Sequence, residues 1–143
     1  MNFETNEEIE AAARAMMACM LPKAAWTHAA HFAAALWLLR DRGEAAARTE
    51  MPGLIRAYNE SVGGRNTDTE GYHETITQAS LHMAARALEA AEGAPLSEVL
   101  AALLAGPCGR PDWIFAYWSR DVLLSPEARR GWIPPDLAQL PEA

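Results

Sequence analysis

Residues 24–40 of the chain read AAWTHAAHFAAALWLLR, a stretch that is rich in alanine and leucine and contains no valine or isoleucine. Alanine and leucine have high helix propensities, whereas valine and isoleucine favour strands. Alanine makes up about a fifth of the whole chain, far above its ordinary usage. We therefore predict an all-α protein, with a helix from about Ala24 to Arg40 or Asp41 that stops at Gly43.

Helical patterns also flank this stretch on both sides. Thr5 or Asn6 is suited to cap a first helix, which ends at Leu21-Pro22. A third helical pattern covers residues 44–62, in which Pro52 predicts either a kink or a division into two shorter helices. Together with the alanine-rich helix, these elements predict a helical bundle.

The second half of the chain predicts shorter elements. A polar loop over residues 65–71 leads into a fourth helix that runs to about Ala91, and a short helix follows over residues 96–104. An aromatic helix or turn is expected at residues 112–119, and a further helix begins at Ser125, where serine caps and the following proline is tolerated.

The prolines of the last segment exclude a helix there, so we expect an extended tail that wraps around the bundle. Three apolar side chains are expected to anchor this tail: Trp132, Ile133 and Leu137. The whole chain, residues 1–143, is thus predicted to be a single-domain bundle of about five to seven helices. Its ends, residues 1–4 and 138–143, are expected to be loosely ordered.

The composition limits the functions that this chain can have. It holds 143 residues with a net charge of -7 at pH 7 and no stripe of Lys and Arg, which argues against nucleic-acid binding. The longest apolar stretch, residues 29–39, is too short to cross a bilayer. Residues 1–10 carry neither a secretory nor a transit signal, so we expect a cytoplasmic location. Cys19 and Cys108 lie far apart and predict no disulfide framework.

Two histidines stand three residues apart in the alanine-rich stretch. On a helix, His28 and His31 lie about 5–6 Å apart at their Cβ atoms, close enough to bind one metal ion. His73 is the better candidate for a third ligand, because it lies beside a polar loop. His82 lies among apolar residues in the middle of a helix, and we interpret it as structural. The alternative is that each histidine is an ordinary core or interface residue.

His73 belongs to a dense polar cluster, Gly71-Tyr72-His73-Glu74-Thr75. We interpret Glu74 as a fourth metal ligand or as a general acid/base acting on a metal-bound water, and Tyr72 as a residue that binds the ligand. Three imidazoles with one open position suit a divalent ion, either Zn, Fe, Mn or Ni. Glu74 is also typical of the first turn of a helix, where the macrodipole favours a carboxylate. A single Glu70-x-x-His73 motif argues against a dinuclear iron centre, which uses two.

Arginines and tryptophans alternate near the end of the chain, where Arg120 follows Trp118, and Arg129 and Arg130 precede Trp132. Arginines beside indoles and a helix N-terminus predict an anion pocket for a carboxylate or phosphate, with Arg120 as a binding residue. The stronger interpretation is structural, because arginines stacked on tryptophans commonly fasten a tail to a bundle. The sequence holds neither a nucleophile elbow nor a phosphate loop.

Several consecutive blocks of this sequence resemble a group of small uncharacterised bacterial proteins. The blocks are Trp26-Thr27-His28-x-x-His31, Tyr58-Asn59, Asn66-Thr67-Asp68-Thr69, Gly71-Tyr72-His73-Glu74-Thr75, Ser125-Pro126-Glu127-Ala128-Arg129-Arg130-Gly131-Trp132 and Pro135-Asp136-Leu137. The resemblance extends from about Leu21 to Leu137 and implies a bacterial, single-domain protein. It implies no particular activity, ligand or partner.

Three functions remain open at this point. The first is a bundle that binds one divalent metal ion through the three histidines, with Glu74 beside them, and uses it for hydrolysis or oxygen chemistry on a small molecule. The second is a metal-free module in which the same histidines and Tyr72 line a ligand pocket or an interface, as a monomer or a homo-oligomer. The third is a partner protein, such as an antitoxin or a complex subunit, which an exposed aromatic patch over Trp113, Trp118 and Trp132 would support.

Overall fold

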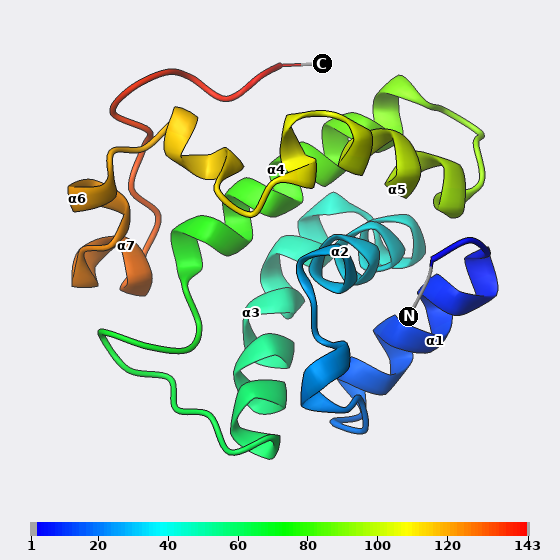
Figure 1. The fold of residues 1–143 in the computed structure, drawn as a ribbon, viewed down its shortest axis with the longest axis horizontal. Coiled ribbons are helices and arrows are strands. Elements are labelled where there is room, and N and C mark those ends of the chain that lie inside the picture. The colour runs from blue at the N-terminus through cyan, green and yellow to red at the C-terminus, as the bar shows by residue number, and fades with distance from the viewer. Residues whose placement is uncertain (1–2, 143) are drawn as a thin grey trace.

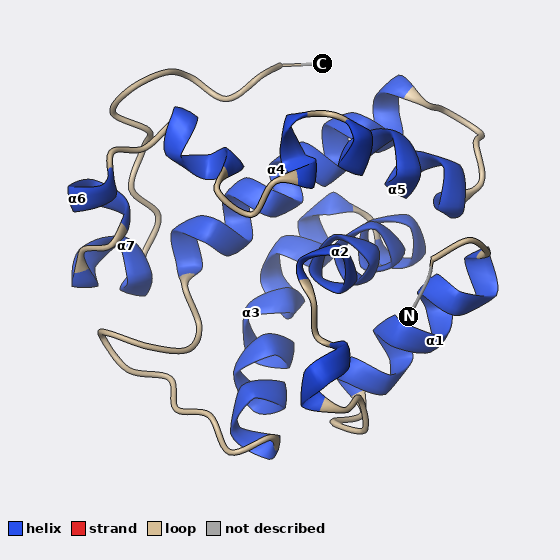
Figure 2. Ribbon diagram, in the orientation of Figure 1, coloured by secondary structure: helices blue, strands red, loops and turns tan. Residues whose placement is uncertain are grey.

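The computed structural model describes residues 3–142, which form seven α-helices, three short 3-10 helices and no strand (Figures 1 and 2). The α-helices are α1 (Asn6–Met17), α2 (His28–Arg42), α3 (Glu44–Ser61), α4 (Glu74–Ala90), α5 (Leu96–Ala105), α6 (Arg120–Leu123) and α7 (Pro126–Arg130). The 3-10 helices are η1 (Lys23–Ala25), η2 (Pro107–Gly109) and η3 (Trp113–Ala116). The all-α prediction is confirmed. Residues 1, 2 and 143, which belong to the ends expected to be loosely ordered, lie outside the described residues.

Helix α2 lies at the centre of the bundle, where it contacts α1, α3, α4 and α5 (Figure 1). Its buried side chains point in every direction around the helix axis: Ala30, Phe32, Ala33, Ala34, Ala35, Leu36, Trp37, Leu38 and Leu39. A helix that is apolar all round is typical of a core element. The alanine-rich stretch therefore forms the core around which the other helices assemble.

Helix α2 begins at His28 and not near Ala24. The Thr27 hydroxyl accepts a hydrogen bond from the Ala30 amide at 3.2 Å, which makes Thr27 the N-cap. Residues 23–25 form η1 instead, and Trp26 stands outside both helices. At the other end Gly43, with a φ of 86°, ends α2 as predicted.

Helix α3 continues through Pro52 without dividing into two helices. Because proline has no N–H, the carbonyl four residues earlier, that of Arg48, has no partner within the helix. Gln78 of α4 supplies that partner, since its Nε2 donates to the Arg48 carbonyl oxygen at 3.1 Å. The contact between α3 and α4 thus replaces the hydrogen bond that the proline removes.

Residues 131–142 form an extended segment that runs alongside α4, here called the C-terminal strap (Figure 1). The Ile133 amide donates to the Thr75 hydroxyl of α4 at 3.1 Å, and the Ile133 carbonyl accepts from Trp118 Nε1 at 2.8 Å. The extended tail is therefore as predicted, but its attachment differs. Leu137, expected as an apolar anchor, is 59 % exposed, so the strap is held largely by its backbone.

The three tryptophans expected to support a partner protein do not form a shared exposed patch. Trp113 and Trp118 are buried, and only Trp132 is substantially exposed, at 44 %.

Cys19 and Cys108 are both free. No helix in the described part of the chain has both the length and the apolar character needed to cross a membrane.

Candidate functional site

Three of the four histidines fasten later parts of the chain to the bundle. Nε2 lies 2.7 Å from a backbone carbonyl oxygen in each case: His28 from Cys108, His73 from Leu123 and His82 from Pro141. Because a carbonyl oxygen only accepts, each Nε2 carries a proton and donates. These bonds attach η2, α6 and the C-terminal strap to α2 and α4.

His73 uses both of its ring nitrogens in the fold. It is the N-cap of α4, where its Nδ1 accepts a hydrogen bond from the Ile76 amide at 3.1 Å. Its Nε2 donates to Leu123, so the ring is a neutral imidazole with one fixed tautomer. Burial lowers the pKa of His73, and the nearby charge of Arg129 lowers it further, whereas the bond to Leu123 opposes the shift.

We expect the free energy of unfolding to fall as the pH drops below 6.5, the ordinary pKa of histidine. The lowered folded pKa of His73 means that the unfolded chain binds the proton first, so the stabilisation is complete above pH 6.5 and is lost toward the folded pKa. The pKa of His31 is lowered as well and acts in the same direction. Urea unfolding at neutral pH and at about pH 5, where most carboxylates remain ionised, measures the loss.

A matched variant assigns this loss to the N-cap histidine. His73→Asn keeps an oxygen that can cap α4 but does not titrate, so its stability should vary less with pH than that of the wild-type protein. An equal pH dependence in both proteins would contradict the assignment.

The three histidines predicted as metal ligands do not meet at one point. His28 is bonded to Cys108 and His73 to Leu123, whereas His31 donates from Nδ1 to the Thr27 carbonyl at 2.7 Å. Within residues 3–142, no three side chains of His, Cys, Asp or Glu are grouped so as to hold a metal ion. The divalent metal site at His28, His31 and His73 therefore stays a prediction without support from this arrangement.

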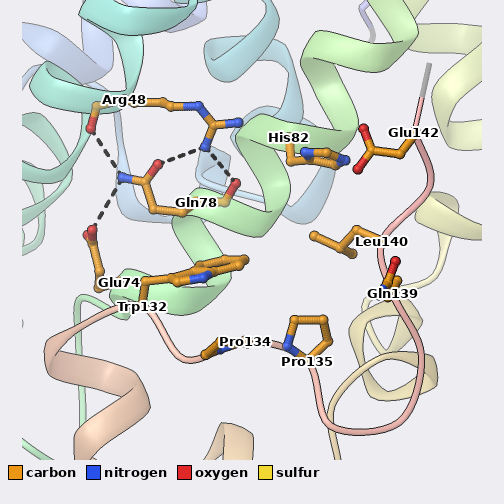
Figure 3. Close-up of a pocket in the computed structure, with 10 residues that line it drawn as sticks. All are labelled: Arg48, Glu74, Gln78, His82, Trp132, Pro134, Pro135, Gln139, Leu140 and Glu142. Atoms are coloured by element: carbon orange, nitrogen blue, oxygen red, sulfur yellow. Dashed lines mark hydrogen bonds between the residues drawn. The ribbon is translucent and has the colours of Figure 1, made fainter.

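A cavity of about 650 Å³ lies between α4 and the C-terminal strap and is called the strap cavity (Figure 3). Its lining residues are Arg48, Glu74, Gln78, His82, Trp132, Pro134, Pro135, Gln139, Leu140 and Glu142. Figure 3 shows Glu74 at one end, Glu142 at the other, and the Trp132 ring along the wall near Glu74. Its volume lies within the usual range of ligand pockets.

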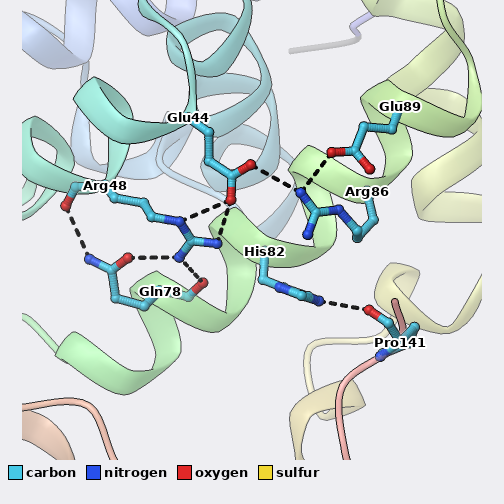
Figure 4. Close-up of polar contacts among 7 residues, drawn as sticks. All are labelled: Glu44, Arg48, Gln78, His82, Arg86, Glu89 and Pro141. Carbon is cyan, nitrogen blue, oxygen red and sulfur yellow. Dashed lines mark hydrogen bonds and ion pairs between the residues drawn. The ribbon is translucent and has the colours of Figure 1, made fainter. Parts of the chain in front are cut away.

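A network of hydrogen-bonded polar side chains on α3 and α4 includes Arg48 and Gln78, which line the strap cavity (Figure 4). Arg48 donates to the Glu44 carboxylate at 2.8 Å and to Gln78 Oε1 at 3.1 Å. Arg86 also donates to Glu44, at 3.0 Å, and to Glu89. The hydrogen bond from Arg48 is the main reason that the pKa of Glu44 is lowered. Both arginines of the network thus have carboxylate partners within it.

Glu74, unlike Glu44, accepts hydrogen bonds from neutral side chains only. Its two carboxylate oxygens accept hydrogen bonds from the Tyr72 hydroxyl and from Gln78 Nε2, the latter at 3.3 Å. No Lys, Arg or His nitrogen among residues 3–142 lies within 4.0 Å of this half-buried carboxylate. Burial, and then the bond to Glu74, raises the pKa of Tyr72 far above its ordinary value, so the phenol keeps its proton.

A second cavity, of about 390 Å³, brings together two of the polar sequence blocks. It is called the Trp26 cavity, and it is lined by Trp26 and His31 from one block and by Tyr72 and His73 from the other. No residue lines both this cavity and the strap cavity. The polar clusters around His31 and His73 therefore do approach each other, although not as metal ligands.

The C-terminal arginines lie outside the strap cavity and the Trp26 cavity, although Arg129 and Arg130 line a smaller one of about 120 Å³. Arg120 places its guanidinium 4.4 Å from the Phe115 ring centroid and lines neither the strap cavity nor the Trp26 cavity. Arg129 donates to the Gly71 carbonyl at 3.0 Å, and Arg130 pairs with Asp68 at 2.8 Å. The position of Arg120 gives no support to the anion pocket predicted there. The contacts of Arg129 and Arg130 agree with the structural interpretation, in which arginines attach the end of the chain to the bundle.

The sequence alone did not identify Arg48, Gln78 or His82 as lining residues of a site. The one available signal was Pro52, because a proline within a helix leaves the carbonyl four residues earlier in need of an outside donor. Pro52 predicts that the Arg48 carbonyl needs an outside donor, but it does not identify Gln78 as that donor. The identity of the donor depends on how α4 packs against α3.

Comparisons of the chain with models of protein families, with curated proteins and with solved structures found no match.

Proposed function

We propose that this protein binds a small organic cation, an amine with an apolar body, in the strap cavity. The observation that carries the proposal is Glu74, a half-buried carboxylate with two neutral donors and no cationic partner among residues 3–142. Removing a carboxylate from water without a counter-charge costs free energy. An ammonium group of a ligand would offset that cost.

The rest of the cavity favours the same ligand class. Trp132, which is 44 % exposed, lines the wall beside Glu74, and an indole face attracts cations more strongly than other aromatic rings do. Glu142 adds a second carboxylate at the far end (Figure 3). The positive charge of Arg48 does not cancel this preference, because Glu44 neutralises it.

The proposal assigns binding and no reaction. Glu74 accepts two hydrogen bonds from neutral donors, and no cationic side chain among residues 3–142 pairs with it. Its predicted role as a general acid/base, and the use of a metal ion, stay predictions.

Calorimetric titration with phenethylamine and with its neutral counterpart phenethyl alcohol tests the proposal. The amine is expected to bind about tenfold more tightly than the alcohol, because only the amine pairs with Glu74. In Glu74→Gln this preference should become much smaller, whereas Trp132→Ala should weaken the binding of both compounds by removing the shared aromatic wall.

The matched control is Glu98→Gln, which removes an exposed carboxylate from the first turn of α5, a helix that contributes nothing to the cavity lining. It should bind the amine as the wild-type protein does. Equal affinities for amine and alcohol in the wild-type protein, or an unchanged preference in Glu74→Gln, would overturn the proposal.

A further inference from the structure

The Trp26 cavity lies where η1, the start of α2, α3 and the loop over residues 63–73 meet. Part of its wall is apolar, formed by the side chains of Trp26, Ile55 and Val62. Its volume of about 390 Å³ falls at the small end of the range for ligand pockets. A cavity of this size suits a molecule with few heavy atoms and one apolar group.

His31 presents a hydrogen-bond acceptor at this cavity. Its Nδ1 donates to the Thr27 carbonyl at 2.7 Å, so Nε2 of the neutral ring has a free lone pair. The ring lies against Trp26, with centroids 3.8 Å apart, which fixes its plane. Desolvation by the surrounding protein atoms lowers the pKa of His31, and the ring is therefore mainly neutral at pH 7. Part of the residue is nevertheless exposed at the surface, where a ligand can reach it.

Charges of both signs surround the same cavity. Lys23 and Arg65 supply positive charge, and Glu70 supplies a carboxylate. None of these three side chains forms an ion pair within the part of the chain that the structure describes. In contrast to Arg48 of the strap cavity, which pairs with Glu44, these groups are available to a ligand.

We infer that the Trp26 cavity is a second ligand site, which takes a small zwitterion, an α-amino acid with an apolar side chain. Its carboxylate pairs with Lys23 and Arg65, and its ammonium group donates to His31 Nε2 and to Glu70. The apolar side chain lies against the wall that contains Trp26 and Ile55. This assignment does not depend on the strap cavity, because the two cavities share no lining residue.

Saturation-transfer NMR and calorimetry with L-leucine, L-methionine and L-phenylalanine test the inference. At least one of these amino acids is expected to bind. N-acetylation removes the ammonium group, and conversion to the amide removes the carboxylate, so each modified form of the bound amino acid should bind about tenfold more weakly. L-glutamate, whose side chain is charged, should bind more weakly than the apolar amino acids.

Two variants locate the binding in the Trp26 cavity. His31→Phe keeps an aromatic ring beside Trp26 but removes the Nε2 acceptor, and the double variant Lys23→Ala/Arg65→Ala removes the carboxylate partners; each should weaken binding about tenfold. Glu98→Gln again serves as the control and should bind normally, and far-ultraviolet circular dichroism checks that each variant is folded. No binding of the three amino acids at millimolar concentration, or binding that both variants leave unchanged, would overturn the inference.

Discussion

The Gly71→Ala variant is expected to lose about 3 kcal/mol or more of unfolding free energy relative to the wild-type protein. Gly71 has a φ of +82°, a left-handed conformation that costs residues with a Cβ about 1–2 kcal/mol. A Cβ built at this position lies 2.0 Å from the Arg65 carbonyl oxygen, which is part of the backbone and cannot rotate away. The loop therefore has to move to accept even one methyl group.

Movement of this loop would break a set of hydrogen bonds that hold it on α3. Asn66 Oδ1 accepts from the Tyr72 amide at 3.0 Å and from Asn59 Nδ2 at 3.1 Å, and its own Nδ2 donates to the Arg56 carbonyl. The same loop delivers Tyr72 to the Glu74 carboxylate. Urea unfolding measures the loss of stability, and titration with phenethylamine shows whether Glu74 remains in place.

Gly53→Ala is the matched control for this substitution. Gly53 lies within α3, is exposed, and a Cβ there would meet nothing within 4 Å. Alanine should stabilise the helix at this site by about 0.5–1 kcal/mol. A Gly71→Ala protein as stable as the wild-type protein would show that the loop accommodates the methyl group and that the close approach to Arg65 does not require glycine.

The helices could be predicted from the sequence because their ends are decided by local groups. Thr5 caps α1 and Ser125 caps α7 with their own hydroxyl groups, as predicted. Thr27 caps α2 in the same way, although the predicted start of that helix lay near Ala24. Gly43 ends α2 through its own positive φ. Such signals involve partners within four residues, so both sides of each interaction are visible in one short stretch of sequence.

The hydrogen-bond partners of three histidines could not be predicted, because they lie far away in the sequence. The carbonyl that His28 binds is 80 residues away, and those of His73 and His82 are 50 and 59 residues away. Spacing along a helix tells which side chains share a face but does not tell what that face meets. Every residue has a backbone carbonyl, so the sequence does not distinguish a histidine that hydrogen-bonds to the backbone from one that binds a metal ion.

Part of the candidate site could be predicted from the sequence. The polar cluster around Tyr72 and Glu74 does form a side-chain pair at a cavity, as an excess of polar groups in an apolar chain suggests. The other walls come from the strap and from Gln78, whose positions depend on tertiary contacts. Sequence patterns therefore located the carboxylate but not the aromatic and proline walls beside it.

The Trp118→Ala variant is expected to lose about 3–5 kcal/mol of unfolding free energy. Trp118 is fully buried, and its indole is the largest such side chain in the core, so alanine leaves a large void. The substitution also removes the Nε1 hydrogen bond to the Ile133 carbonyl, which holds the strap. Loss of this attachment should weaken phenethylamine binding in addition to lowering stability, as urea unfolding and calorimetry can measure separately.

Trp132→Ala separates the two effects. The rings of Trp118 and Trp132 meet edge to face with centroids 5.6 Å apart, yet Trp132 is 44 % exposed and its side chain donates no hydrogen bond to the described residues. Its removal should cost about 1 kcal/mol of stability or less while weakening amine binding, because this indole lines the strap cavity. If Trp132→Ala destabilised the protein as much as Trp118→Ala does, Trp132 would be a structural residue, and its place in a binding wall would lose its support.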